Sequence, residues 1–444
     1  MTDSDADALP MATAGTQTAA QRRMWRSKFE SALIWAGLAA LLLFLGHHVF
    51  SDAEVRYREL SDLLQRGQLS SSKFSLIGPL FSTPIWFIGG WLHLPHNGVG
   101  VYNWVVFTLG VGALYLLLKD HIDRGLLRTF LLLLIAASMF PYHLTNYYGE
   151  VFTAVCLAVG LVAVHVGRIA LGWTLVVLGV VNTPAALVAL AIVVAVRAAR
   201  TRRARSVLPL VAAAVLIAAE NWIRRGSPFA SNYESGFGLP FFALLAILFS
   251  FGKGLIFFTP GLFLLVRRRL ERLEPVRKRL LAALQVDWIV FVVGLVAVYS
   301  SWWAWGGGWF WGPRFFLFAS FPASLMLAIA LRHHGTHLLL DLATLLTLCL
   351  SVWVDIDGAV FGNGALFNLC VSNNYARGYL CDYVPSDSVL WHPFVAPQHL
   401  TLLNLAYIAY CAVVLIYLAA PVTRSVAATS FTWARGLVGA RWQF

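Results

Sequence analysis

Long apolar runs, separated by short charged or glycine-rich segments, make up most of the chain from about residue 30 onward. A hydrocarbon core of about 30 Å is crossed by roughly 20 apolar residues in a helix. The pattern therefore predicts a series of membrane-spanning helices. They lie near residues 31–50, 101–118, 127–143, 150–167, 207–223, 239–266, 283–300, 315–331, 336–353 and 400–419.

The apolar segment 169–196 does not fit a single crossing. The chain on both of its sides is expected on the same side of the membrane, so the segment has to cross twice or dip and return, turning at VNTP (181–184). Short, broken helices are tolerated at membrane depth only where they are buried in protein or line a polar cavity. With this pair included, we expect about twelve membrane segments.

The first segment between apolar runs, 51–99, is too long for a simple turn. It opens with the amphipathic stretch EVRYRELSDLLQRG, which predicts a helix lying in the membrane interface. The apolar residues expected on one side of that helix are Val55, Leu60, Leu63 and Leu64. The later part, 74–92, is apolar but broken by two prolines, which indicates a re-entrant or interfacial element.

Composition agrees with this pattern. Hydrophobic residues form 59% of the 444 residues and charged residues only 12%, whereas soluble domains average about 45–50% and 25%. The mean hydropathy is +0.72. We therefore expect an all-α polytopic membrane protein with interfacial helices in its first external loop.

The placement of the basic residues predicts an orientation. Most of the 33 lysines and arginines fall in clusters at 22–28, 119–128, 168, 197–205, 267–279, 332 and 424–441. The positive-inside rule places these clusters, and both termini, in the cytoplasm. It also explains the net charge of +12 without nucleic-acid binding. Because the first apolar run lacks a cleavage site, we interpret it as a transmembrane helix and not as a signal peptide.

This orientation divides the chain into a cytoplasmic tail (1–29), a transmembrane domain (30–420) and a second cytoplasmic tail (421–444). The alanine- and arginine-rich spans point to a bacterial inner membrane. The expected external loops are 51–99, 141–150, 224–238, 301–314 and 354–399.

Cys370 and Cys381 bracket VSNNYARGYL in the last of these external loops. An oxidising compartment permits a disulfide between them, and two free thiols are the alternative.

Asp52 and Glu54 follow the first apolar run directly. In an extended chain they share one face, where a carboxylate could take a proton from an acceptor hydroxyl. The pair could also hold a divalent cation such as Mg²⁺ or Mn²⁺ through its oxygens. A solvated loop or a helix cap explains the same residues without chemistry.

A third acid, Glu150, lies in NYYGEVFTA beside Tyr148, where an external loop enters the next helix. An acid in a first helical turn also stabilises the helix dipole. Glu150 is therefore either a second catalytic carboxylate or a helix-terminal charge.

Two cations interrupt apolar or aromatic sequence. Lys253, in FSFGKGLIFFTPGLFLL, has no charged neighbour in sequence, and a charge at membrane depth is costly unless it is paired or hydrated. Arg314 ends the stretch SSWWAWGGGWFWGPR, and arginine suits bidentate phosphate recognition. An anion site is one interpretation of Lys253; snorkelling towards the interface is the other.

Taken together, these residues predict one external face that carries acids, cations and aromatic platforms, which suits an anionic lipid-carried donor and a hydroxyl acceptor. Arg56 and Lys73 are further candidates for binding the donor phosphate. The candidates for stacking against a sugar ring are Tyr57, Tyr148, Trp303 and Trp311.

The chain also resembles the GT-C superfamily of integral membrane glycosyltransferases, nearest to the protein O-mannosyltransferase-like and aminoarabinose-transferase-like branch. Three motifs carry the resemblance: SDAEVRY after the first helix, SFGKGLIFFTP, and WWAWGGGWFWGPRF. Their order covers most of residues 30–331. The chain lacks the soluble C-terminal domain that many relatives carry, which leaves the acceptor open.

The resemblance implies a polyprenyl-phosphate sugar donor, a non-cytoplasmic active site and inversion at the anomeric carbon. By the same resemblance, Asp52 is the catalytic base or orients the acceptor, Glu150 is the acid of the second loop, and Lys253 and Arg314 face the donor phosphate. The main alternative is a secondary transporter or lipid flippase, and a non-catalytic receptor or assembly factor is a further one.

Overall fold

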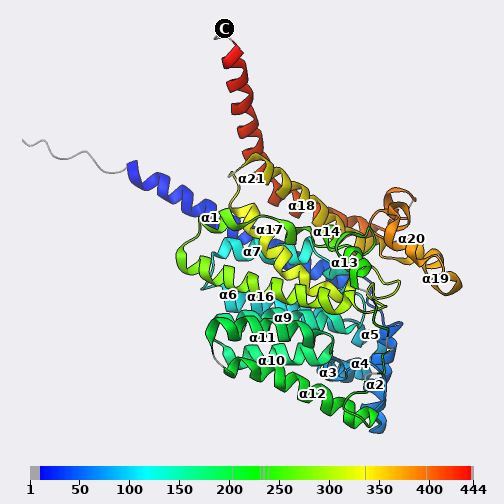
Figure 1. The fold of residues 1–444 in the computed structure, drawn as a ribbon. Helices are drawn as coiled ribbons and strands as arrows, with labels where there is room; N and C mark the ends of the chain where they lie inside the picture. Colours follow the sequence, from blue (N-terminus) through cyan, green and yellow to red (C-terminus); the bar gives the residue numbers. More distant parts are fainter. Residues whose placement is uncertain are drawn as a thin grey trace, which may run out of the picture.

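The structure is a computed structural model that describes residues 11–441, except residues 203, 231, 234, 235, 239, 336 and 397. In this part of the chain every regular element is helical. Extended pairing is limited there to two isolated bridges, one between His48 and Asn146 and one between Phe237 and Trp302. The long helices pack side by side in a bundle (Figure 1), which confirms the all-α expectation.

Within the described residues, the bundle contains twelve helices. They are α1 (Met11–Leu43), α6 (Tyr102–Leu118), α7 (Arg124–Ala136), α9 (Gly149–His165), α10 (Ile169–Asn182), α11 (Ala186–Thr201), α12 (Leu208–Arg225), α13 (Pro240–Phe249), α16 (Pro275–Ser300), α17 (Ser320–Arg332), α18 (Leu338–Ile356) and α21 (Leu402–Arg441).

Shorter helices connect them. The α-helical ones are α2 (Asp52–Arg66), α3 (Ile77–Phe81), α4 (Thr83–Trp91), α5 (Pro95–Gly100), α8 (Phe140–Leu144), α14 (Leu255–Phe258), α15 (Arg267–Leu270), α19 (Phe367–Tyr375) and α20 (Gly378–Tyr383). Single turns of other helix types are η1 (Ala204–Val207), η2 (Pro260–Phe263), η3 (Arg314–Ala319), η4 (Asp357–Phe361), η5 (Gly364–Leu366), η6 (Pro385–Asp387) and η7 (His392–Phe394).

Length and composition identify membrane segments among the described helices. Six are long and apolar enough to cross a bilayer by themselves, which is the property of a polytopic integral membrane protein. They are Gly98–Leu118, Arg205–Arg225, Pro275–Ser300, Arg314–Arg332, Leu338–Phe361 and Leu402–Phe431.

The segment 51–99 contains four helices in the structure, the first of which, α2, is the helix that the sequence predicts. Helices α2–α5 lie at the same end of the bundle as α19 and α20 (Figure 1). The buried face of α2 differs from the expected one, because it carries Arg56 and Glu59 together with Ala53 and Leu60, whereas Val55 is exposed. This face packs against protein, where Glu59 pairs with Arg224 at 2.8 Å and Arg56 donates to the backbone oxygen of Ser75 at 3.4 Å.

The break predicted within 169–196 is present. Helix α10 ends at Asn182 and α11 begins at Ala186, so the chain turns within the segment that contains VNTP. Helices α9 and α10 approach closely at two glycines: a Cβ on Gly160 would lie 2.7 Å from the Gly172 carbonyl oxygen. Small residues at such a crossing let the two backbones touch, which fixes the α9–α10 pair as one unit.

The prediction of a single span over 239–266 is wrong. Helix α13 ends at Phe249, and the chain continues as a turn, the short helix α14 and the turn η2. Gly252 and Gly254 interrupt the helical pattern, and Pro260 lacks the backbone N–H that a continuing helix needs. Lys253 therefore lies in a turn and not within a transmembrane helix.

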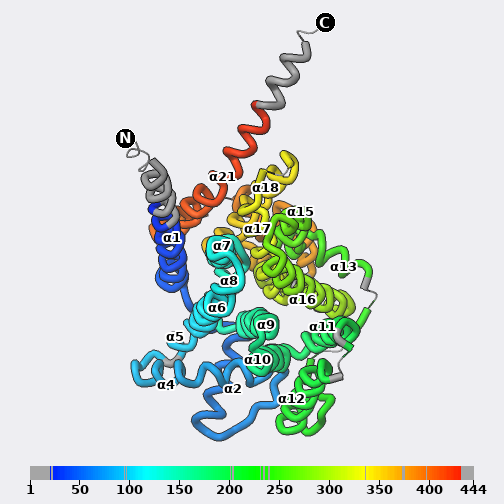
Figure 2. Tube along the Cα trace, turned by 90° about the vertical axis from the view of Figure 1, so that its left-hand side faces the viewer, coloured from blue at the N-terminus to red at the C-terminus, as the bar shows by residue number. Residues whose placement is uncertain are grey.

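The core of the bundle is formed around α17, whose residues from Ser320 to Leu331 are all buried. Helix α7 packs beside α17, and α9 packs against η3 and α16; both helices have nearly continuous buried faces. In contrast, α12 lies at the periphery next to α10 and α11 (Figure 2). Most of its apolar surface is exposed, as expected for a helix that faces lipid.

Buried ion pairs join the helices at the end opposite to α2. Glu30 of α1 is fully buried and accepts hydrogen bonds from Arg128 Nε and Arg332 Nη2, each at 2.6 Å, and from Tyr417 Oη at 2.7 Å. Asp287 of α16 accepts from Arg197 Nη1 at 2.6 Å. These contacts connect α1, α7, α17 and α21 in one cluster, and α11 with α16 in another.

Candidate functional site

A cavity of about 390 Å³ lies between α2, the start of α9, the α10–α11 turn, α16 and η3. Its lining is polar at one end and apolar at the other. The charged residues in the lining are Asp52, Arg56, Lys73, Glu150 and Arg314. All five are residues that the sequence singled out, and they come from four separate segments of the chain.

Arg314 connects the two acids of the cavity. Its Nη1 lies 2.9 Å from Asp52 Oδ2 and 3.7 Å from Glu150 Oε1. Asp52 is the first residue of α2 and Glu150 lies in the first turn of α9, while Arg314 begins η3. The starts of three elements therefore meet at one point, and the positive ends of the α2 and α9 dipoles favour negative charge there.

The Arg314 side chain is fixed by aromatic packing as well as by charge. Its guanidinium carbon lies 3.9 Å from the centroid of the Phe310 ring and 5.0 Å from that of Phe315. A cation over an aromatic face is stabilised further when it is desolvated. The position of Arg314 therefore depends on the loop that carries Phe310.

Arg56 and Lys73 line the same cavity without compensation by an acid. Within the described ranges, neither has a carboxylate at ion-pair distance. Arg56 is only 7% exposed, and its guanidinium lies over the Phe74 ring at 4.5 Å. The Lys73 ammonium lies 5.5 Å from the centroid of the same ring and 5.7 Å from that of Tyr233. A buried cation without a counter-ion is costly. The buried Arg56, together with the exposed Lys73 on the same lining, is therefore a candidate anion site.

The backbone that presents Lys73 is held by α12. Arg224 donates to the carbonyl oxygens of Ser70 and Phe74, at 2.9 and 2.5 Å, and Arg225 Nε donates to that of Ser72 at 3.0 Å. Arg224 is itself paired with Glu59 of α2 at 2.8 Å. Residues 70–76 thus form a fixed wall of the cavity, although they contain no helix.

The other end of the cavity is apolar. It is lined by side chains from α9, the α10–α11 turn, α11, α16 and η3, namely Ala154, Leu157, Ala185, Ala186, Phe291, Leu295, Val298, Leu317 and Phe318. A slot of this kind accepts a hydrocarbon chain, whereas the charged end accepts a polar anionic group. The cavity is therefore amphipathic along its length.

Glu54 lies outside the cavity, which corrects its assignment as a catalytic acid. Because α2 is helical from Asp52, residues two positions apart point in different directions. Glu54 accepts hydrogen bonds from His96 and Arg58, each at 2.7 Å. The hydrogen bond with His96 lowers the pKa of Glu54. Tyr57 packs against His96 as well, and it does not line the cavity.

Three further candidates are also placed elsewhere. Trp303 is 57% exposed and packs over Gly236, and Trp311 is fully buried and donates its indole N–H to Asp357 Oδ2 at 2.7 Å. Lys253 is buried outside the cavity lining and donates to two backbone carbonyls. Lys253 does not line the cavity, so its assignment as a ligand of the donor phosphate has no support from the cavity lining.

The cavity also contains aromatic residues that the sequence did not single out. Tyr233, Tyr299 and Trp302 line it. Of the four aromatic residues proposed to stack against a sugar ring, Tyr148 alone is in the lining. Tyr299 stacks on Phe315 with ring centroids 4.4 Å apart. The VNTP segment also contributes, through Asn182, Thr183 and Pro184. Its helix break was a usable signal, because broken helices line polar cavities.

The acids do not fit a divalent cation held by Asp52 and Glu54. Their side chains diverge, and Asp52 already shares the Arg314 guanidinium with Glu150. In the described part of the chain, no group of three or more His, Cys, Asp or Glu residues is arranged to hold a metal ion. The positive charge that the acids face is that of an arginine.

The structure forms a disulfide between Cys370 and Cys381, the pairing that the sequence suggested. It joins α19 to α20 within the segment 354–399.

No protein-family model matches the sequence, and neither a curated protein nor a solved structure matches the chain. Function must therefore be inferred from the geometry of the cavity.

Proposed function

We propose that the protein is a membrane glycosyltransferase of the GT-C type. In this proposal it moves a sugar from a polyprenyl-phosphate donor to a hydroxyl group of a cell-envelope glycan, lipid or protein, on the non-cytoplasmic face. The supporting observation is the amphipathic cavity, in which Asp52, Glu150 and Arg314 meet at one end and an apolar slot forms the other. A polyprenyl-phosphate sugar has the same division into an anionic head and a hydrocarbon tail.

Arg56 and Lys73 receive the donor phosphate in this proposal. They line the polar end and lack carboxylate partners in the described chain, so a phosphate group compensates their charge without breaking an existing ion pair. Fixed cations also stabilise the negative charge that develops as the phosphate leaves. The prenyl chain then occupies the slot between α9, α11, α16 and η3.

Asp52 acts as the general base. Its Oδ2 accepts from Arg314, and its side chain is 25% exposed towards the cavity. The acceptor hydroxyl oxygen bonds to the anomeric carbon, the bond from that carbon to the phosphate oxygen breaks, and the hydroxyl proton passes to Asp52. Attack from the side opposite to the phosphate inverts the anomeric centre, as in other inverting transfers. Arg314 and Glu150 hold the carboxylate in position.

The proposed topology counts all twelve bundle helices as membrane segments and places the polar end of the cavity outside the cytoplasm. The basic clusters of the sequence support this orientation, because Arg128, Arg197 and Arg332 all lie near the helix ends that point away from the cavity. The positive-inside rule places such residues in the cytoplasm. Two of the three motifs that carry the GT-C resemblance contribute residues to the cavity lining. SDAEVRY contributes Asp52, and WWAWGGGWFWGPRF contributes Arg314. A bacterial inner membrane is the proposed location.

The test is a transfer assay with purified protein in lipid nanodiscs and a panel of radiolabelled polyprenyl-phosphate sugars. We expect transfer of label to a hydroxyl acceptor by the wild type and loss of transfer in Asp52→Asn. Asp62→Asn is the matched control, because Asp62 lies on the same helix, outside the cavity lining, and forms an exposed ion pair with Arg66. Flipping of the lipid across liposomes without cleavage of the sugar–phosphate bond would instead support the flippase alternative.

A further inference from the structure

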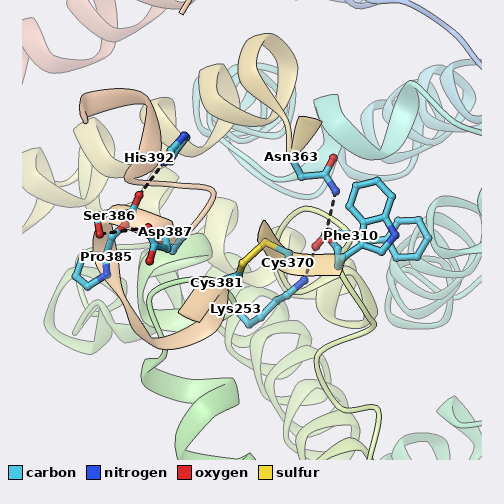
Figure 3. Close-up of a disulfide and its surroundings, with 11 residues drawn as sticks. Lys253, Phe310, Asn363, Cys370, Cys381, Pro385, Ser386, Asp387 and His392 are labelled. Atoms are coloured by element: carbon cyan, nitrogen blue, oxygen red, sulfur yellow. Dashed lines mark hydrogen bonds between the residues drawn. A yellow bond between two sulfur atoms is a disulfide. The ribbon is translucent and has the colours of Figure 1, made fainter. Parts of the chain in front are cut away.

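Lys253 is a buried cation that the proposed chemistry does not use. It is 6% exposed and lies in the turn between α13 and α14. Its ammonium group donates to the carbonyl oxygens of Phe310 and Gly312, the latter at 3.0 Å. Figure 3 shows the side chain extending from beneath the disulfide towards Phe310. The ligands of this cation are therefore backbone oxygens of a distant loop.

The loop that Lys253 contacts precedes Arg314 and lacks regular structure. Gly307, Gly308 and Gly312 all have left-handed backbone conformations, with φ of 71°, 76° and 61°. Backbone carbonyls that have no helical partner need other donors. Asn363 Nδ2 donates a hydrogen bond to the Trp309 carbonyl oxygen at 2.9 Å. Lys253 donates to the carbonyl oxygens of Phe310 and Gly312. Side chains from outside the loop thus hold its shape.

The same loop sets the position of Arg314. The Phe310 ring packs against the guanidinium at 3.9 Å. At Gly307, an added Cβ would lie only 3.0 Å from the Arg314 side chain. A displaced Phe310 would therefore move Arg314 relative to Asp52 and Glu150. Lys253 acts on the cavity through this packing and not by touching it.

The turn that carries Lys253 contacts residues 381–382, next to the Cys370–Cys381 disulfide. The Gly252 N–H donates to the Asp382 carbonyl oxygen at 3.0 Å, and a Cβ on Gly252 would lie 2.1 Å from the Cys381 carbonyl oxygen. Cys381 is bonded to Cys370, which is buried in the hydrophobic core. Burial raises the pKa of the Asp382 carboxyl, and the charge of Lys253 opposes that rise.

We propose that Lys253 is a positioning residue for Arg314, and that the Cys370–Cys381 disulfide anchors Lys253 through residues 381–382. The inference rests on the proposed transfer reaction and adds to it a dependence on an intact disulfide. It makes full activity a property of the oxidised protein, as expected for an external loop in an oxidising compartment.

The test compares Lys253→Met with Lys253→Arg. We expect Lys253→Met to lower kcat roughly 10–100-fold with little change in the donor KM, because Arg314 is displaced while Arg56 and Lys73 stay in place. Lys253→Arg keeps a buried cation with several donors and should recover a large part of kcat. Hydrogen exchange of the amides in residues 306–314 should become faster in Lys253→Met and return towards the wild-type rate in Lys253→Arg.

The disulfide is tested separately with the double variant Cys370→Ser, Cys381→Ser, which leaves Lys253 intact. We expect faster amide exchange in 306–314 and a lower kcat, whereas Cys349→Ser, which removes an exposed free thiol, should change neither. Unchanged exchange and kcat in Lys253→Met, or in the double variant, would overturn the link. If the wild type transfers no sugar, the proposed function fails, and the exchange rates still decide whether Lys253 and the disulfide hold the loop.

Discussion

Asp52 and Arg314 are separated by 262 positions in the sequence and joined by a contact of 2.9 Å. This single ion pair ties the start of α2 to the start of η3 at the polar end of the cavity. Glu150 shares the guanidinium at 3.7 Å, so one cation holds two carboxylates together. Removing it would leave both acids facing each other.

Arg314→Ala should therefore lower kcat by roughly 10²–10³-fold, because the acids repel each other and Asp52 loses its orientation. Added guanidinium ion should restore part of the rate by occupying the vacated position. The control is Arg66→Ala, which removes an exposed ion pair on α2. Full activity of Arg314→Ala in the labelled-donor assay would exclude Arg314 from the mechanism.

Arg56→Met should raise the donor KM roughly tenfold, since a hydrogen bond to a charged group contributes about 1.5–3 kcal/mol. The acceptor KM should stay close to that of the wild type. Arg58→Met is the control, because Arg58 is exposed on the same helix and pairs with Glu54 outside the cavity. Equal changes in both KM values would argue against a phosphate site at Arg56.

Gly149→Ala tests the same site from the neighbouring helix. An added Cβ would lie 2.8 Å from Arg56 Nη2, which forces the guanidinium to move. We expect a donor KM raised by roughly tenfold or less, with thermal stability largely retained. Gly112→Ala in α6 has nothing within 4 Å of the new methyl group and should behave as the wild type.

Glu54→Gln should keep transferase activity, because Glu54 faces His96 and Arg58 outside the cavity. The hydrogen bond with His96 lowers the pKa of Glu54 in the folded protein. Its contribution to stability is therefore complete above the unfolded pKa of about 4.3 and is lost as the pH falls through the lower folded value. Thermal unfolding of the variant and the wild type should differ near pH 6 and converge in more acidic buffer.

Glu30→Gln should destabilise the protein by roughly 3–5 kcal/mol, because it leaves the partly buried Arg128 and Arg332 without the carboxylate that they share. The control Glu274→Gln removes an exposed pair with Arg277 and should cost less than about 1 kcal/mol. Thermal unfolding in detergent measures both. Similar melting temperatures would show that the cluster contributes little.

The sequence predicted the elements whose signal is local. The amphipathic helix after residue 51, the break at VNTP and the Cys370–Cys381 pair each follow from residues close together in the chain. The convergence of Asp52, Glu150 and Arg314 was also expected, because all three were assigned to one side of the membrane.

The predictions that were wrong depended on distant partners. Lys253 looked like an unpaired intramembrane charge, because its partners are backbone oxygens 57 and 59 positions away. Every residue has a carbonyl group, so the sequence does not indicate which of them will accept a hydrogen bond. Asp52 and Glu54 appeared to share a face because an extended chain was assumed where α2 already begins. Tyr299 and Tyr233 also line the cavity beside residues that are distant in the sequence, and nothing in their local sequence indicates this.

The buried ion pairs of Glu30 and Asp287 lie at one end of the bundle, and the cavity lies at the other. Ionic contacts thus hold the helices together at one end, whereas at the other end α9, α16 and η3 line the cavity and Arg314 links η3 to α2 and α9. In the proposed function, the hydrocarbon chain of the donor would enter sideways from the bilayer through a small outward tilt of these elements, with the ion-paired end as the pivot.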